Sequence, residues 1–168
     1  MPGKKQQVSV DPAALGLSQL AQFVGACVNR QVLGDMQRAG FGDLRESHGY
    51  LVQHLLRGPH SVGQLAELLG VSQQAVSKTV AELTGAGYLE VVPGKDARVR
   101  LVQLSARGQA SVQAARRFRA LAEARLEKRL GERRARQLHA GLLELLEELG
   151  GLEQVIGRRV PMPDAKRG

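Results

Sequence analysis

Residues 73–78 bring together side chains that end in amide, hydroxyl and ammonium groups. A glutamine amide can bridge N6 and N7 of adenine, a lysine ammonium reaches O6 and N7 of guanine, and a serine hydroxyl bonds to either base. Val76, Val80 and Leu83, spaced by four and three residues, predict an apolar stripe on one side of a helix here. The opposite side carries the polar residues Gln73, Gln74, Ser77 and Lys78. This face suits contact with the major groove of duplex DNA.

A basic turn follows this helix along the chain. Residues 88–92 and 98–104 alternate in polarity around the turn cluster 93–96, so the pattern predicts a β-hairpin, or wing. The hairpin tip carries three cations, Lys95, Arg98 and Arg100. An arginine there can enter the minor groove, where narrow A·T tracts concentrate negative potential. Asp96 is placed to hold the guanidinium of Arg98.

The polar helix needs a support that fixes its angle. Ser61, followed three residues later by Gln64, is a capping-box pattern that predicts the start of a short preceding helix. Ser72 is the expected cap of the polar helix. The link through Gly70 is so short that the two helices must cross steeply, as in a helix-turn-helix.

Long helices are expected on both sides of this unit. The first, about 13–38, carries an apolar stripe of Leu17, Leu20, Val24 and Cys27, and a second helix beginning at Asp43 or Ser47 runs to about Arg57. Ser105 is the expected cap of a helix over 106–130, which Gly131 separates from a last helix over 132–150.

The last helix carries a leucine seam that is wider than one partner helix would cover. Its members follow a heptad pattern that Leu152 continues and that Leu143 and Leu146 widen: Leu138, Leu142, Leu145 and Leu149. Together with Leu17, Leu20 and Val24 of the first helix, this seam predicts a homodimer. Folding back of the seam onto the first helix of the same chain is the alternative.

The composition agrees with a protein that binds a polyanion in the cytoplasm. The formal net charge is +8 and the sequence pI is about 10.4, which favours a polyanionic partner. The single cysteine excludes an intramolecular disulfide and fits a reducing compartment. We expect neither a signal peptide nor a membrane span, because no apolar run is long enough. No nucleophile elbow, dinucleotide loop, zinc-protease or P-loop pattern is present, so we expect no enzyme and no cofactor.

Residues 61–110 resemble the winged helix-turn-helix of the MarR family of bacterial transcription regulators. The matching positions are residues 61–69, 71–78, Leu83 and 87–89, and the most specific is Asp96-Ala97-Arg98 followed by Leu101, Leu104-Ser105 and Gly108. The resemblance implies a dimeric repressor that leaves a palindromic operator when an effector binds. It implies Arg98 in the minor groove, Thr79 beside the other major-groove residues, and Ser61 and Ser72 near phosphates.

The resemblance also raises the question of an effector. Some family members sense peroxides through a cysteine in the first helix, but the apolar stripe around Cys27 predicts a buried, structural thiol. His48 and Tyr50 lie near the position at which relatives hold small aromatic acids, so they are candidate effector contacts. A spacing of six places His48 and His54 on different faces, and the histidine pair of zinc-sensing members is missing, so we expect no metal site.

These patterns predict a mainly helical fold with a small β-hairpin wing. The expected divisions are a flexible arm (1–12), N-terminal helices for dimerisation and support (13–57), a winged helix-turn-helix (58–105), C-terminal dimerisation helices (106–157) and a flexible tail (158–168). The expected function is sequence-specific binding of a palindromic operator by a homodimer, with a small aromatic acid as the effector. A winged-helix adaptor for another protein and a redox sensor using Cys27 remain the alternatives.

Overall fold

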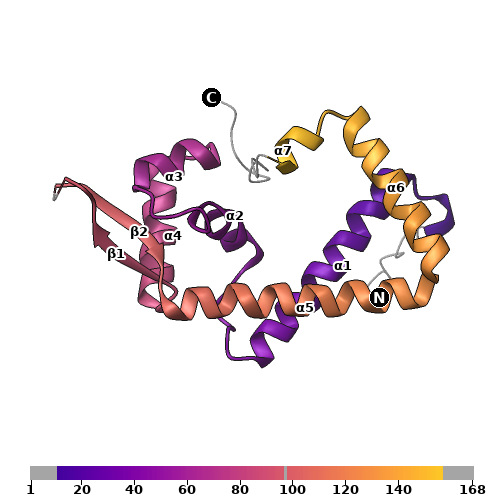
Figure 1. Ribbon diagram of the computed structural model, residues 1–168, viewed down its shortest axis with the longest axis horizontal. Helices are drawn as coiled ribbons and strands as arrows, with labels where there is room; N and C mark the ends of the chain where they lie inside the picture. Colours follow the sequence, from indigo (N-terminus) through magenta and orange to yellow (C-terminus); the bar gives the residue numbers. More distant parts are fainter. Residues whose placement is uncertain (1–10, 97, 157–168) are drawn as a thin grey trace, which may run out of the picture.

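The computed structural model of the chain describes residues 11–96 and 98–156 (Figure 1). The expected arm and tail lie largely outside this part, as does Ala97 in the wing. The described elements are a 3-10 turn η1 (Pro12–Ala14), α1 (Leu17–Arg38), α2 (Glu46–Leu55), α3 (Val62–Leu69), α4 (Gln73–Gly85), β1 (Leu89–Pro93), β2 (Arg100–Leu104), α5 (Ala106–Leu130), α6 (Glu132–Glu148) and α7 (Leu152–Ile156). The fold is mainly helical, with one two-stranded antiparallel hairpin, as the sequence predicted.

A single apolar core joins α2, α3, α4 and the hairpin. Its most deeply buried members are Leu51 of α2, Leu65 of α3, Val76 and Leu83 of α4, and Tyr88. The stripe of Val76, Val80 and Leu83 faces this core, as its spacing predicted. Helix α2 contributes Leu51 and Leu55, so the expected division between residues 57 and 58 cuts α2 from the core in which it packs.

The hairpin is held in a fixed register and extended by one further segment. Leu89 pairs with Leu104 and Pro93 with Arg100, which places Val91 opposite Val102. On the other side of β2, the backbone of His60 exchanges two hydrogen bonds with Val102, of 3.0 and 2.8 Å. The segment between α2 and α3 is thereby tied to the wing.

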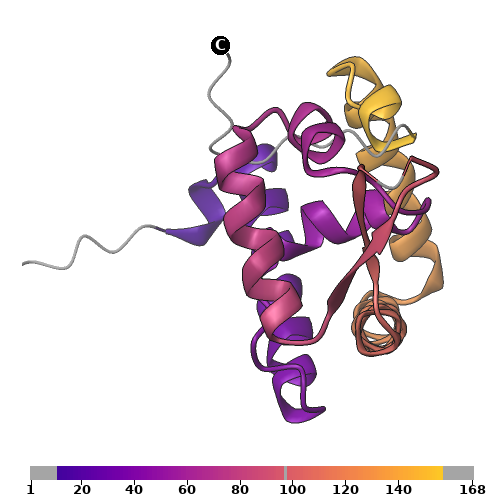
Figure 2. The ribbon, with the colours of Figure 1, turned by 90° about the vertical axis from the view of Figure 1, so that its left-hand side faces the viewer.

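Helix α5 forms a straight beam along which the other parts are arranged. At 25 residues it is about 37 Å long. The wing and α4 lie at one of its ends and α6 at the other, while α1 packs across its middle (Figure 1). In the view along α5, the hairpin rises beside α4 on the same side of the beam (Figure 2).

Several boundaries differ from the expected ones for local reasons. The first helix begins at Leu17, because Asp11 caps the separate turn η1 with its carboxylate. Helix α6 ends near Glu148, because Gly150 adopts a left-handed backbone with φ of 66°. Leu152 therefore begins α7 and does not continue the leucine seam.

Candidate nucleic-acid interface

The helix-turn-helix is built from two capped helices and one left-handed glycine. The Ser61 hydroxyl accepts from the Gln64 N–H at 3.2 Å and the Gln64 side chain accepts from the Ser61 N–H at 2.8 Å, which confirms the predicted capping box. Gly70 ends α3 with φ of 66°, a conformation that disfavours any residue with a Cβ. The Ser72 hydroxyl then accepts from the Ala75 N–H at 3.2 Å, so Ser72 caps α4 as predicted.

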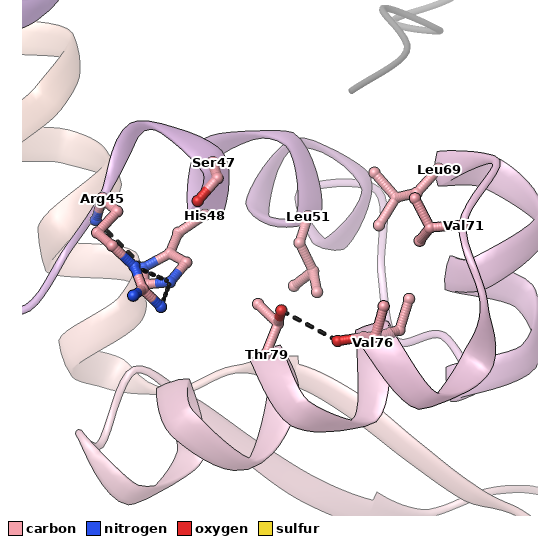
Figure 3. A pocket seen from close by; sticks show the side chains of 9 residues that line it. Arg45, Ser47, His48, Leu51, Leu69, Val71, Val76 and Thr79 are labelled. Atoms are coloured by element: carbon pink, nitrogen blue, oxygen red, sulfur yellow. Dashed lines mark hydrogen bonds between the residues drawn. The ribbon is translucent and has the colours of Figure 1, made fainter. Parts of the chain in front are cut away.

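Most of the residues predicted to contact the major groove lie on the exposed side of α4. The side chains of Gln73, Gln74, Ser77 and Lys78 are exposed. Thr79 differs from the prediction, because it is half-buried and its hydroxyl donates to the Ala75 carbonyl at 3.2 Å. Thr79 faces a small hollow of about 90 Å³ between α2 and α4, lined also by Leu51 and Val76 (Figure 3). It therefore belongs to the rear of α4.

The wing presents three exposed cations beside this face. Lys95, Arg98 and Arg100 are exposed, and within the described chain none of them has an ion-pair partner. The Asp96 carboxylate accepts from the Arg98 backbone N–H at 2.9 Å and does not hold its guanidinium, which corrects the expected contact. Asp96 therefore shapes the turn, and the exposed Arg98 side chain remains free of it.

A compact junction fixes the wing against the start of α5. The Ser105 hydroxyl donates to the Gly87 carbonyl and accepts from the Gly108 N–H at 3.1 Å, so the predicted cap also closes the base of the hairpin. The Arg107 guanidinium lies 4.7 Å from the centre of the buried Tyr88 ring and donates to its hydroxyl at 3.1 Å. Hydrogen bonding to Tyr88 raises the pKa of Arg107. Sequence reasoning missed Arg107, because its contact is 19 residues away.

Behind α4, an ion pair between the exposed side chains of Arg45 and Glu82 links the start of α2 to α4 and covers the buried His48. Arg45, just before α2, hydrogen-bonds to both carboxylate oxygens of Glu82 on α4. His48 is 2% exposed, accepts from the Arg45 backbone N–H at 3.2 Å and lies 3.9 Å from the Glu82 carboxylate. Burial lowers the pKa of His48, as does the Arg45 charge, against the opposing effect of Glu82. His48 is therefore held neutral at physiological pH.

A cavity of about 170 Å³ lies between α1, α2 and α5. Apolar side chains such as Val32, Met36 and Val52 line its walls. The polar residues of the lining include the cations Arg45 and Arg119, the carboxylate Glu46, His48 and Asn29. Of the candidate effector contacts His48 and Tyr50 and the candidate sensor Cys27, only His48 lines this cavity. Tyr50 packs against the core of the winged helix instead.

The predicted dimerisation residues form an uncovered apolar surface. In the single chain, Leu17 is 75% and Leu149 is 81% exposed. The other five are also exposed: Leu20, Val24, Leu138, Leu142 and Leu145. Cys27 lies on the same face of α1 and is exposed in the single chain, so the predicted burial of its thiol depends on a partner that covers this face.

Among the described residues, no group of three or more histidine, cysteine, aspartate or glutamate side chains is placed to hold a metal ion. None of the helices described is long and apolar enough to cross a membrane.

Comparison with known proteins places this geometry in a family. Residues 43–98 match the MarR family model. No curated protein matches the chain. A mutant of S. aureus MepR bound to an oligodeoxyribonucleotide is 18% identical, with a TM-score of 0.61 over 80% of this chain and 99% of that one. The YusO protein of Bacillus subtilis is 20% identical, with a TM-score of 0.64 over 79% and 99%.

The apo form of E. coli MarR has the same arrangement. It is 19% identical, with a TM-score of 0.62 over 79% of this chain and 97% of that one. At these identities the solved structures establish the fold, while the family model matches the segment that holds α2, α3, α4 and β1. Residues 43–98 of the chain therefore match the MarR family, and the chain carries the winged helix-turn-helix fold of the MarR-type structures that it resembles.

Proposed function

We propose that this chain is a sequence-specific DNA-binding transcriptional regulator. The observation that carries the proposal is that the exposed polar face of α4 lies beside a wing whose Arg98 side chain has no partner among residues 11–96 and 98–156. The likeness to a MepR structure bound to an oligodeoxyribonucleotide supports it. In this arrangement α4 enters the major groove, and the wing follows the backbone into the minor groove. The regulator acts in the cytoplasm, where bacterial DNA is accessible to it.

A gel-shift series tests DNA binding. Duplexes tiled across the DNA upstream of the chain's own coding region serve as probes, at low ionic strength. Arg98→Ala is expected to weaken specific binding by about 1–3 kcal/mol, which is the scale of one groove contact. Arg98→Lys, which keeps the charge but loses the planar fork, separates shape from charge, and Arg30→Ala on α1 is the matched control.

Two results of that series would reject the proposal. The absence of any shift across the tiled region favours the alternative of a protein-binding adaptor, which has no need of Arg98. Equal affinities of the wild type and the Arg98→Ala variant would remove the wing from the interface. Affinity should also fall steeply with added salt, because bound phosphates release counterions.

The second part of the proposal is a homodimer. The exposed leucines of α1 and α6 form an apolar face too large to leave in water, and a second copy offers an identical face. A two-fold dimer would bind a palindromic operator with half-sites about one helical turn apart. A footprint confined to one half-site would argue against it. The same interface would cover the face of α1 that carries Cys27, which weighs against a redox-sensing thiol.

The third part concerns regulation. We propose repression that is relieved when a small aromatic acid enters the cavity between α1, α2 and α5. An acid would meet Arg119 and His48 there, while the Glu46 carboxylate in the same lining is already held by the Asn29 amide at 2.7 Å. Benzoate and its hydroxylated forms are suitable first probes, and loss of the gel shift is the expected result. Filling the cavity by Ala115→Leu should leave DNA binding intact and abolish the release. Release that is unaffected by this substitution would place the effector elsewhere.

A further inference from the structure

The positive charge of the chain is concentrated far from α4, the helix proposed to enter the major groove. Residues 58–105 hold four Lys and Arg against four Asp and Glu, so the winged helix carries no net charge. Residues 116–136, which we call the basic elbow, hold nine Lys and Arg against three Glu. The elbow thus supplies most of the formal +8 of the chain.

All nine cations of the elbow are exposed, and most have no partner. Arg119 donates to the Asn29 side chain at 3.0 Å, Arg117 lies over the Phe118 ring, and Arg136 pairs with Glu132. The other six have neither an ion pair nor a hydrogen bond from their side chains within the described chain: Arg116, Arg125, Lys128, Arg129, Arg133 and Arg134. Glu123 and Glu127 are about 200° around the helix from Arg125, so they do not neutralise its face.

The arrangement disfavours the isolated chain. Arg125 and Arg129 are like charges four residues apart, a spacing that disfavours a helix, although the dipole of α5 favours Arg129 in its last turn. Arg133 and Arg134 lie in the first turn of α6, where the helix dipole repels cations. A bound polyanion would relieve the repulsion in both pairs.

The elbow lies too far from α4 to share one short stretch of DNA with it. Arg125 is 19 residues along α5, about 29 Å from the end that carries the wing. Figure 1 shows the wing and α4 at one end of this beam and α6 at the other. Arg133 lies nine residues, or about 180°, from Leu142, so it remains exposed when a second copy covers the leucine seam.

We propose that the basic elbow binds the phosphate backbone of a second segment of duplex DNA. Eight of its nine cations are arginines, whose planar forks match phosphate oxygens in pairs. The elbow has only one aromatic residue, Phe118, which is half-buried, so it offers neither a stacking surface for bases nor an aromatic anchor for a membrane. This proposal rests on the proposed function, because a regulator bound to one DNA site holds its basic elbows close to the phosphates of neighbouring DNA.

A two-duplex capture assay tests the proposal. One duplex is immobilised on beads, a second of unrelated sequence carries a fluorophore, and the full chain is added at low ionic strength. The wild type should retain the labelled duplex. The variant Arg129→Gln/Arg133→Gln should lose at least ten-fold in retention, and its salt slope for the second duplex should fall by about 1.8. Arg30→Gln/Arg38→Gln on α1 removes the same charge and should leave retention unchanged.

The outcomes separate the two proposals. The elbow variant should fold, because it removes repulsion, and a thermal melt checks this. If the elbow variant retains as much labelled duplex as the wild type, the elbow proposal is wrong. The two winged helices of a dimer would then bridge the duplexes. If the wild type binds one duplex but does not retain the second, the elbow proposal is wrong, and the proposal of a DNA-binding regulator stands.

Two further results complete the test. If duplex binding survives Arg98→Ala but not the elbow substitutions, the winged-helix proposal fails and the elbow stands. If the wild type binds anionic vesicles of phosphatidylserine or an acidic peptide but no second duplex, the surface belongs to that partner and the proposal is wrong.

Discussion

Gly108, in the first turn of α5, lies where the wing and α5 meet at their closest. A Cβ added there would come 2.1 Å from the Tyr88 carbonyl oxygen and 3.1 Å from a methyl group of Leu104. The Tyr88 carbonyl also accepts the Ser105 N–H at 3.1 Å, so it cannot retreat without disturbing the cap of α5. We therefore predict that Gly108→Ala pushes the base of the hairpin away from α5.

The expected loss of stability is the balance of three effects. Overpacking of this kind costs about 1–3 kcal/mol. Weakening of the Ser105 cap adds up to about 1 kcal/mol. Replacing a helical glycine by alanine returns about 1 kcal/mol through helix propensity. The net change in the free energy of unfolding is therefore a loss of about 2 kcal/mol.

Urea unfolding at a fixed protein concentration measures this change. With a slope near 2 kcal/mol per molar urea, the midpoint should fall by about 1 M. Gly49→Ala is the matched control, because its Cβ meets nothing within 4 Å in the interior of α2. That variant keeps only the propensity gain, so its midpoint should rise by about 0.5 M. If the two variants shift in the same direction, the close approach at Gly108 is refuted.

Three further predictions concern the cap, the histidines and the dimer. Ser72→Ala should destabilise the chain by about 1 kcal/mol, because the hydroxyl that caps α4 is lost. Ser72→Asp should not, because an aspartate also accepts hydrogen bonds from the N–H groups of the first turn of α4. Equal urea midpoints for the two variants would contradict the cap. Burial lowers the pKa of both His48 and His54, so the unfolded chain binds more protons below about pH 6.5. Stability should hold above that pH and decline on acidification, and a midpoint that rises in acid would be inconsistent with buried neutral histidines. Leu142→Glu should yield monomers in analytical ultracentrifugation, whereas the exposed Gln137→Glu in the same helix should not; a dimeric Leu142→Glu would exclude the leucine seam from the interface.

Local chemistry made much of the fold predictable. Ser61, Ser72 and Ser105 cap their helices as expected, because each cap depends only on groups within three residues. The alternating strands and their turn cluster likewise gave the hairpin, with ends shifted by one or two residues. Among the residues predicted to contact the major groove, the position of Thr79 was open to prediction. Three residues beyond Val76, it falls on the buried side of α4.

The predictions that failed or stay open share a different origin. The stripe around Cys27 marks an apolar face, but periodicity does not say whether the same chain or a second copy covers it. The spacing of Asp96 and Arg98 allowed an ion pair, and the turn used the carboxylate for a backbone N–H instead. The network of Arg45, His48 and Glu82 joins groups 37 residues apart, so no local pattern contains it.

The division of charge bears on how such a regulator would select its sites. A winged helix without net charge gains little from the general attraction between cations and phosphates, so its affinity must depend on a few placed contacts from α4 and Arg98. Wrong sequences then lose a large share of the binding energy. The elbow adds affinity that is blind to sequence, and its distance from α4 means that it reaches phosphates other than those beside that helix. Moving the cations of the elbow onto the winged helix would raise affinity for all DNA and lower the share of the binding energy that depends on sequence.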